Sequence, residues 1–305
     1  MKALFVENRL ERFAAGKAAK LVSRLATLSA PFSPLRYAEV PEPRVPGPRW
    51  LRVDWSACGL CGTDVHLMTL ELDPRSFPAA LPGLPRVFLG HEALGVVAEA
   101  GAQVRGVAAG DRVVPRIDWP SCAQMEIEPP CPQCAAGATL RCENLGLRPL
   151  PPDLGGGFSP RAVLHRSQPF RVPDGLTDDQ ALLLEPAAVA CHAVLRGGIR
   201  PEERVLVVGA GAIGLLVVAA LRFSFPATPV LCLARHRFQA DVAQALGATV
   251  VEGGEGLYAR LARATGARHV RGHLGNEILL GGFDTVFDTV GSDGSLRDGL
   301  RWLRG

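Results

Sequence analysis

The segment that most constrains the fold is "VLVVGAGAIGLL", in which three glycines follow an apolar run at the spacing GxGxxG. It lies between a strand-like run and an apolar helical pattern, the place such a motif takes in a βαβ unit. There Gly209 permits a tight turn, Gly211 lets a pyrophosphate approach the backbone, and Gly214 lets helix and strand pack closely. Free N–H groups at the helix N-terminus would bind phosphate. The sequence predicts a dinucleotide-binding unit, with a merely structural glycine-rich turn as the alternative.

The strand after this motif indicates which dinucleotide is bound. An acidic residue roughly 20 positions after the glycines would bind the ribose hydroxyls of NAD. No carboxylate occurs between Gly214 and Asp241, and Ala234 stands at the expected place. Arg235 and Arg237 follow it, and arginine binds a ribose 2′-phosphate through charge-assisted hydrogen bonds. We predict NADP rather than NAD; the alternative is that these arginines cap a solvated loop.

The chain of 305 residues divides into two parts of different pattern. Residues 1–175 are rich in Pro and Gly, and their short runs "WLRVDWSACG", "ALGVVAEAG" and "GDRVVPRI" are typical of an irregular β-rich domain. Residues 176–305 alternate apolar runs with helical patterns, which predicts a parallel sheet with helices on both faces. The boundary is placed near the start of "LTDDQALLLEPAAVACHAVLRGG", where Thr177 is a candidate N-cap. The expected class is α/β with two domains.

Composition excludes several kinds of partner. The net charge is +3 and the basic residues are spread along the chain, so no nucleic-acid footprint is visible. No apolar run approaches the roughly 20 residues of a membrane span, and the N-terminus lacks the order of a secretory signal. Eight cysteines without an export signal favour metal binding over disulfides. We expect a cytoplasmic protein that acts on a small molecule.

Soft and acidic side chains gather in "CGLCGTDVH" and "GHEALGVV". A catalytic zinc takes three ligands from Cys, His and carboxylate and keeps one position open. Cys61, His91 and the adjacent Glu92 fit that description. Cys58 and Cys61 form a CxxC whose alternatives are a redox pair or buried thiols. A thioredoxin-like site is disfavoured because this CxxC does not open a helix in a βαβ unit.

Several segments together carry a family resemblance. From about residue 50 to residue 291 the chain resembles the zinc-dependent medium-chain dehydrogenase/reductase family, which includes alcohol, polyol, threonine and glucose dehydrogenases. The resemblance implies a GroES-like catalytic domain that binds zinc and a Rossmann-like cofactor domain. The matching segments, in family order, are "CGLCGTDVH", "GHEALGVV", "GDRVV", "CPQCAAGATLRC", "LLEPAAVACHAV", "VLVVGAGAIG" and "FDTVFDTVG".

The resemblance assigns metal ligands position by position. Cys61 and His91 match ligands of the catalytic zinc, and Cys58 does not. Glu92 matches an acidic residue that is a ligand in the polyol branch. Glu185 matches the glutamate that replaces the third cysteine of the alcohol dehydrogenases and binds the metal directly or through water. These matches place the chain nearer the polyol, threonine and sugar dehydrogenases.

The resemblance also assigns proton-transfer residues. Thr63 matches the hydroxyl that takes the substrate proton, and His66 matches the imidazole at the end of that relay. Asp64 matches the carboxylate that orients the ligand histidine and so fixes its tautomer. Zinc would polarise the substrate oxygen while hydride passes to or from the nicotinamide.

A second cysteine group is found in "EIEPPCPQCAAGATLRC". Cys131, Cys134 and Cys142 match three ligands of the family's structural zinc. The fourth family cysteine would lie three residues before Cys131, where this chain has Glu128. Because Glu128 keeps the spacing, we favour it as the fourth ligand. Cys122, in a segment that looks like an insertion, is the alternative, and an empty lobe is another.

The predicted function is zinc- and NADP-dependent oxidation of a secondary alcohol of polyol, sugar or amino-alcohol type, or reduction of its carbonyl counterpart. The chain ends at "DGLRWLRG", before further strands found in the family, so we expect C-terminal truncation. The family also implies a homo-oligomer. One alternative is a catalytically inactive nucleotide- or zinc-binding fragment. Another is a zinc-free quinone reductase of the same superfamily, which Cys61, His91 and Glu92 argue against.

Overall fold

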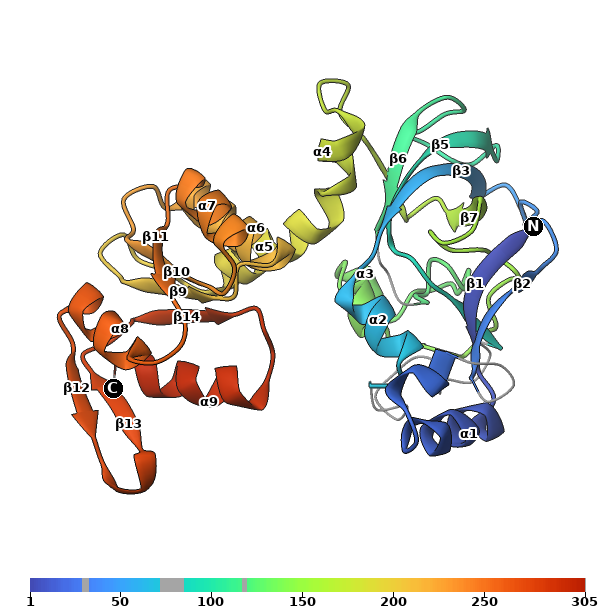
Figure 1. Cartoon of the computed structure of the whole chain (residues 1–305). Coiled ribbons are helices and arrows are strands. Elements are labelled where there is room, and N and C mark those ends of the chain that lie inside the picture. The colour runs from blue at the N-terminus through green and yellow to red at the C-terminus, as the bar shows by residue number, and fades with distance from the viewer. Residues whose placement is uncertain (29–32, 72–84, 117–119, 305) are drawn as a thin grey trace. The chain divides into compact units, whose positions relative to one another are not determined.

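The computed structural model describes residues 1–28, 33–71, 85–116 and 120–304. The chain forms two compact units, unit 1 at Met1–Glu185 and unit 2 at Pro186–Gly305, and each is described by itself (Figure 1). The division falls inside the helical stretch at whose start the sequence analysis places the boundary. The α/β class, with a β-rich first part and a parallel-sheet second part, is confirmed.

Unit 1 contains two sheets among its described residues. The larger has the antiparallel order β7-β3-β5-β6-β8, and the smaller has the order β2-β1-β4. Their bounds are β1 Lys2–Glu7, β2 Leu35–Glu39, β3 Trp50–Gly59, β4 Arg86–Phe88, β5 Glu92–Ala100, β6 Arg112–Pro115, β7 Arg161–His165 and β8 Pro169–Arg171.

Alternation along β3 explains why this strand is central. Leu51 and Val53 are fully buried, and they pack with Val97 and Val113 of neighbouring strands. Because successive side chains point to opposite faces, this pattern fixes which face meets the core and therefore the register of the strand. In this register the end of β3 lies beside the start of β5, and the candidate site lies there.

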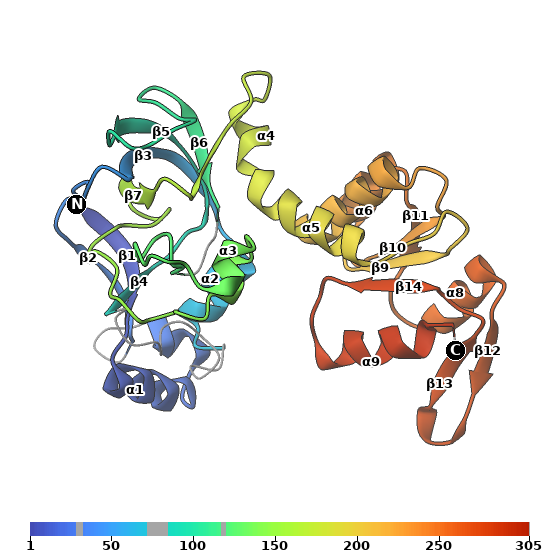
Figure 2. The same cartoon turned by 180° about the vertical axis from the view of Figure 1, so that it is seen from behind.

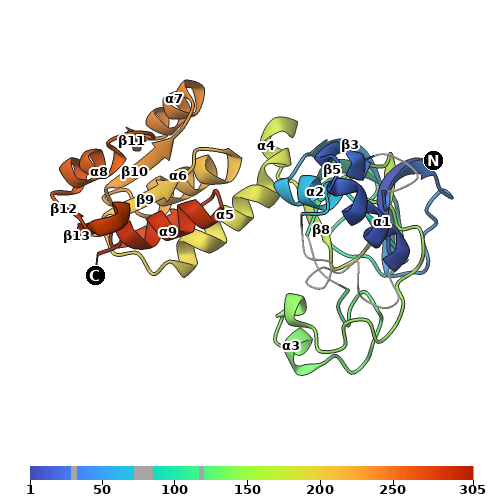
Figure 3. The same cartoon turned by 60° about the horizontal axis from the view of Figure 1, so that its bottom comes forward.

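Short helices connect these strands. Thr177 caps α4, as predicted, because its Oγ1 accepts a hydrogen bond from the N–H of Gln180 at 3.3 Å. Figure 3 shows α3 set apart from the strands of the unit, in a lobe of its own. The bounds are α1 Leu10–Lys20, η1 Arg24–Leu28, α2 Gly62–Met68, α3 Pro132–Ala135, η4 Thr139–Arg141, α4 Asp178–Leu182 and α5 Leu184–Arg196, the last of which continues into unit 2.

Unit 2 is built on a parallel sheet of order β11-β10-β9-β14. The strands are β9 Val205–Val208, β10 Val230–Ala234, β11 Thr249–Glu252 and β14 Thr285–Asp288. All four residues of β9 are buried, as expected for a strand covered on both faces.

Helices cover both faces of this sheet (Figures 1 and 2). Helices α5, α6 (Ala212–Ser224) and α7 (Arg237–Ala245) pack on one face, where Val205 and Val207 point. Helices α8 (Leu257–Thr265) and α9 (Asp293–Trp302) pack on the other, with Leu206 and Val208. A hairpin of β12 (Arg268–Arg271) and β13 (Glu277–Leu280), with η5 (His273–Gly275) at its turn, adds Leu279 to the second layer. The predicted βαβ rhythm is confirmed.

Candidate functional site

Three potential metal ligands meet where β3 ends beside the start of β5. Gly59 is paired with Glu92 in the strand register, so the chain beyond Gly59 passes His91. The Cys61 thiol, an imidazole nitrogen of His91 and a carboxylate oxygen of Glu92 lie within 4.8 Å of one another, and all three residues are half-buried. Thiol, imidazole and carboxylate form a donor set that suits zinc and leaves room for one more ligand.

Asp64 lies behind this group, and only 1% of its surface is exposed. Its Oδ2 accepts a hydrogen bond from the N–H of Cys61 and its Oδ1 one from the N–H of Gly90, both at 3.1 Å. Oδ1 also lies 3.6 Å from Nδ1 of His91. Interaction with this carboxylate raises the pKa of His91 to about 9, although burial opposes the shift. Asp64 thus lies where the sequence analysis expects a carboxylate that orients His91.

Glu185 lies near this group but not within it. Its carboxylate is not among the atoms that gather within 4.8 Å around Cys61, His91 and Glu92. Burial and the charge of Glu92 raise the pKa of Glu185, and His91 acts in the opposite direction. The residue is therefore within electrostatic reach of the cluster.

Thr63 and His66 lie three residues apart on α2, which places them on one side of that helix, and both are exposed. Nδ1 of His66 lies 2.5 Å from Oε2 of Glu71. The sequence analysis does not single out Glu71. The contact depends on Leu70, whose φ of +51° turns the chain back, and leucine gives no sequence signal for that conformation.

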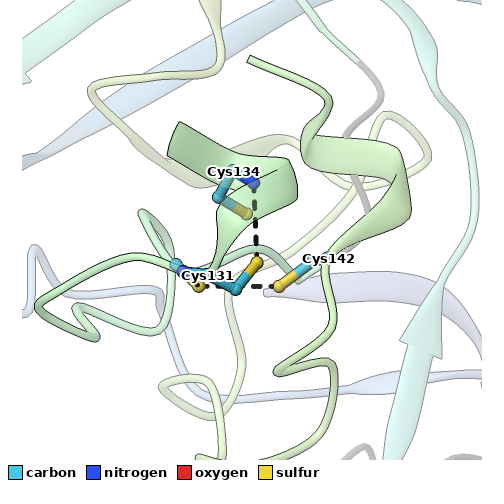
Figure 4. A group of neighbouring side chains, drawn as sticks. Cys131, Cys134 and Cys142 are labelled. Carbon is cyan, nitrogen blue, oxygen red and sulfur yellow. Dashed lines mark hydrogen bonds between the residues drawn. The ribbon is translucent and has the colours of Figure 1, made fainter. Parts of the chain in front are cut away.

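The lobe around α3 gathers four cysteines, and Figure 4 shows three of them, Cys131, Cys134 and Cys142, turned toward one another. With Cys122 they place four sulfur atoms within 4.8 Å of one another. The Cys122 and Cys142 sulfurs are 3.7 Å apart. Four thiols at this separation match a closed, tetrahedral structural zinc site.

The structure brings Cys122 into this group, whereas the sequence analysis favours Glu128. Cys122 is 1% exposed, because the turn that follows it closes with the Ile127 N–H bonded to its carbonyl at 2.9 Å. The Glu128 side chain is 71% exposed and lies 3.2 Å from Arg49. Spacing alone suggested Glu128, but the turn directs that side chain to the surface.

Backbone N–H groups point at the sulfurs of the lobe. Those of Cys134 and Glu143 lie 3.5 and 3.4 Å from the Cys131 sulfur. These hydrogen bonds lower the pKa of the Cys131 thiol below its ordinary value. The N–H of Cys131 and the side-chain amide of Asn144 in turn donate to Cys122. Donors of this kind stabilise thiolates, the form in which cysteine binds metal.

In unit 2 the three glycines form the turn between β9 and α6. Gly209 has φ +94°, which glycine adopts readily. A Cβ on Gly214 would lie 2.0 Å from the carbonyl oxygen of Gly209, so only glycine fits there. A Cβ on Gly211 would meet no protein atom within 4 Å. The backbone at the start of α6 therefore faces open space, where a pyrophosphate fits.

A cavity of about 1360 Å³ lies over the C-terminal ends of these strands. Ala234, Arg235 and Arg237 line it, together with Gly209 and Gly211. Sequence reasoning missed other lining residues at the C-terminal end of β11 and just after β11 and β14, since their position depends on the sheet order. Among these are Glu252, Gly253, Thr289 and Val290.

Comparisons with known proteins identify the family. A family model described as "Alcohol dehydrogenase GroES-like domain" matches residues 47–174. A solved structure of a zinc-binding dehydrogenase from Sinorhizobium meliloti 1021, bound to NADP, is 32% identical. The match covers 88% of this chain and 70% of that chain, with a TM-score of 0.63. This chain belongs to the zinc-dependent medium-chain dehydrogenase/reductase family.

Two of the curated relatives are named as dehydrogenases. The 2-dehydro-3-deoxy-L-galactonate 5-dehydrogenase of Pseudoalteromonas atlantica is 35% identical over 56% of this chain and 46% of its own length. D-arabinitol dehydrogenase 1 of Uromyces fabae is 32% identical over 82% of this chain and 63% of its own length. The chain thus spans less than two thirds of the length of either relative.

Family membership confirms that unit 1 contains a GroES-like domain and that unit 2 is Rossmann-like. The first of these two relatives is named for a sugar acid and the second for a polyol. Among the residues described, no helix of this family member has the length and apolar character of a membrane span.

Proposed function

We propose that this chain is a zinc- and NADP-dependent dehydrogenase of secondary alcohols of the polyol, sugar or amino-alcohol type, or a reductase of their carbonyl counterparts. The observation that carries the proposal is the half-buried group of Cys61, His91 and Glu92 beside buried Asp64. The substrate class is supported by the names of the relatives, one a dehydrogenase of a sugar acid and one of a polyol. The even charge pattern supports a small-molecule substrate rather than a nucleic acid.

In this proposal Cys61, His91 and Glu92 hold the catalytic zinc, and Glu185 acts through water. A zinc ion there would supply Lewis-acid polarisation of the substrate oxygen. Thr63 takes the proton from the substrate hydroxyl and His66 passes it to solvent. An imidazole suits that step, because one ring nitrogen can accept a proton and then release it to water.

The cavity of unit 2 would hold the cofactor, which accepts the hydride when bound. Gly209, Gly211 and the N-terminus of α6 would bind the pyrophosphate. Arg235 and Arg237 would bind the ribose 2′-phosphate, and Ala234 leaves room for it because it carries no carboxylate. The four cysteines of the lobe, with Cys122 in place of Glu128, would hold a structural zinc.

Metal content and turnover test this proposal together. We expect two zinc ions per chain in the wild type, and one in each of the variants Cys61→Ser and Cys131→Ser. Only Cys61→Ser should abolish alcohol oxidation while the lobe keeps its metal. A substrate screen with NADP and NAD then compares polyols, sugars and amino alcohols. Folded protein that binds no zinc would overturn the mechanism, and zinc binding without turnover on any of these alcohols would favour an inactive binding protein.

A further inference from the structure

The contact between His66 and Glu71 involves a carboxylate that the proposed relay does not use. We propose that Glu71 is a positioning residue that fixes the tautomer of His66, so that Nε2 of the ring is free to accept the proton leaving the substrate. This inference rests on the proposed function and adds a residue to its proton relay.

Two contacts tie Glu71 to His66. The carboxylate Oε2 lies 2.5 Å from Nδ1 of the ring. The backbone N–H of Glu71 also donates to the carbonyl oxygen of His66 at 2.8 Å. The backbone of Glu71 is therefore bonded to the end of the helix that carries the imidazole.

The chain between the two residues is held by the core. Leu70 has φ +51°, a conformation that leucine rarely adopts, and only 7% of its surface is exposed. It packs in an apolar cluster with Phe13, Leu67 and Leu89. The corner that presents Glu71 is thus fixed by buried side chains.

The chemistry follows from what a carboxylate can do. An ionised carboxylate only accepts hydrogen bonds, so Nδ1 must carry the hydrogen and Nε2 of neutral His66 keeps its lone pair. In alcohol oxidation the proton leaves the Thr63 hydroxyl, forms the Nε2–H bond, and then passes to water. While the ring holds that proton, the neighbouring carboxylate balances its charge.

Two other charged side chains described at this corner have hydrogen-bond partners of their own. Asp64, on the same helix, is buried and bonded to the N–H groups of Cys61 and Gly90. Lys20 of α1 donates to the carbonyl oxygen of Leu70 at 3.4 Å. Within the described part of the chain, Glu71 is the carboxylate in contact with the His66 ring.

A direct test is the ¹⁵N NMR spectrum of the histidine rings in the full zinc-loaded chain, with His66→Gln to assign the signals. We expect neutral His66 to carry its proton on Nδ1 in the wild type. In Glu71→Ala it should return to the tautomer mixture of a solvated histidine. Glu71→Met keeps the length of the side chain without its hydrogen-bond acceptor and serves if the alanine variant does not fold. Glu11→Gln, an exposed carboxylate on α1, is the matched control. An unchanged His66 spectrum in the Glu71 variants would overturn the assignment.

Kinetics gives a second, independent readout. Glu71→Ala should lower kcat for alcohol oxidation about tenfold at pH 7, with KM within about twofold, because only the proton step is affected. The deficit should shrink as pH rises, since hydroxide then takes the proton. In a His66→Gln background Glu71→Ala should cause no further loss; an additive loss would contradict the role. A wild type without turnover would refute the proposed function alone, and the NMR result would still decide on Glu71.

Discussion

Asp64 is the residue on which three pieces of the proposed metal site converge. Its two carboxylate oxygens accept from the backbone before α2 and from the turn before β5, and one of them lies beside His91. A single side chain thus sets both the spacing of Cys61 from His91 and the orientation of the imidazole. Partners of this kind affect metal affinity although they do not touch the metal.

Replacing Asp64 by Asn should weaken zinc binding at Cys61 and His91 by about 10- to 100-fold. The amide has only one oxygen, so it cannot accept both backbone hydrogen bonds and orient the ring as well. Competition with a chromophoric chelator measures the affinity of the weaker zinc while the lobe metal stays bound. Asp111→Asn, at a partly exposed carboxylate paired with Arg171, is the control. Equal affinities in wild type and Asp64→Asn would contradict this account.

Arg235 and Arg237 should decide which cofactor is used. The double variant Arg235→Ala/Arg237→Ala should raise KM for NADP about 10- to 100-fold. A hydrogen bond to a charged group contributes roughly 1.5–3 kcal/mol. KM for NAD should change by less than about threefold, since NAD lacks the phosphate. Steady-state kinetics with both cofactors provides the measurement. The control is Arg263→Ala, which changes an exposed arginine on α8. An equal rise in KM for NADP and for NAD would show that the arginines do not select the phosphate.

At the scale of elements, the β9–α6 turn separates two uses of glycine. At Gly214 a side chain would collide with the backbone of Gly209, whereas at Gly211 it would enter the open space assigned to the cofactor. Gly211 has φ −75°, which any residue adopts, so an alanine there brings no backbone strain. Stability and cofactor binding should therefore separate between the two positions.

The variants Gly214→Ala and Gly211→Ala test this separation. Gly214→Ala should lower the melting temperature clearly, with a loss of roughly 1–3 kcal/mol from forced displacement of the helix. Gly211→Ala should melt like the wild type but bind NADP at least about tenfold more weakly. Thermal denaturation measures the melting temperature of each variant, and fluorescence titration measures its affinity for NADP. The reverse pattern would mean that the cofactor does not approach the backbone at Gly211.

At this scale the sequence predicts those features that depend on residues close together in the chain. The βαβ rhythm and the glycine turn follow from short-range patterns. Cys61, His91 and Glu92 come together because the register of β3 against β5 brings their segments side by side. The lobe ligand at Cys122 could not be chosen, because the path of the intervening turn decides whether Cys122 or Glu128 points inward. Glu71 was missed since the left-handed Leu70 is stabilised by distant core residues, which no nearby sequence reveals.

At the scale of the whole molecule, His165 couples stability to pH. The ring is 2% exposed, contacts Trp50 edge-on at 5.2 Å, and hydrogen-bonds Ser167 Oγ through Nδ1 at 2.9 Å. Its Nε2 has no hydrogen-bond partner among the described residues. Burial lowers the pKa of His165 from 6.5 to about 4, so the folded state favours the neutral ring.

Between pH 6.5 and 4 the unfolded chain therefore binds a proton that the folded chain does not. The contribution of His165 to stability should be fully present above pH 6.5 and should fall as the pH drops toward 4, by roughly 1–3 kcal/mol. Urea denaturation at pH 7 and pH 5 measures the free energy of unfolding. His165→Gln, which takes up no proton in this range, should show a smaller difference between the two pH values. If the free energy of unfolding changed equally between pH 7 and pH 5 in the wild type and in His165→Gln, His165 would be excluded as the source of the pH dependence.

The position of Cys122 bears on how metal sites shift within a sequence. Taking a ligand nine residues before Cys131 instead of three enlarges the loop that a bound metal would close. Loop-closure entropy grows only with the logarithm of length, so this change costs roughly 1 kcal/mol, far less than a structural zinc contributes. A ligand can thus migrate along the chain while the site stays in place. Searches that require fixed cysteine spacing will overlook such sites, whereas searches for sulfur atoms that converge in space will find them.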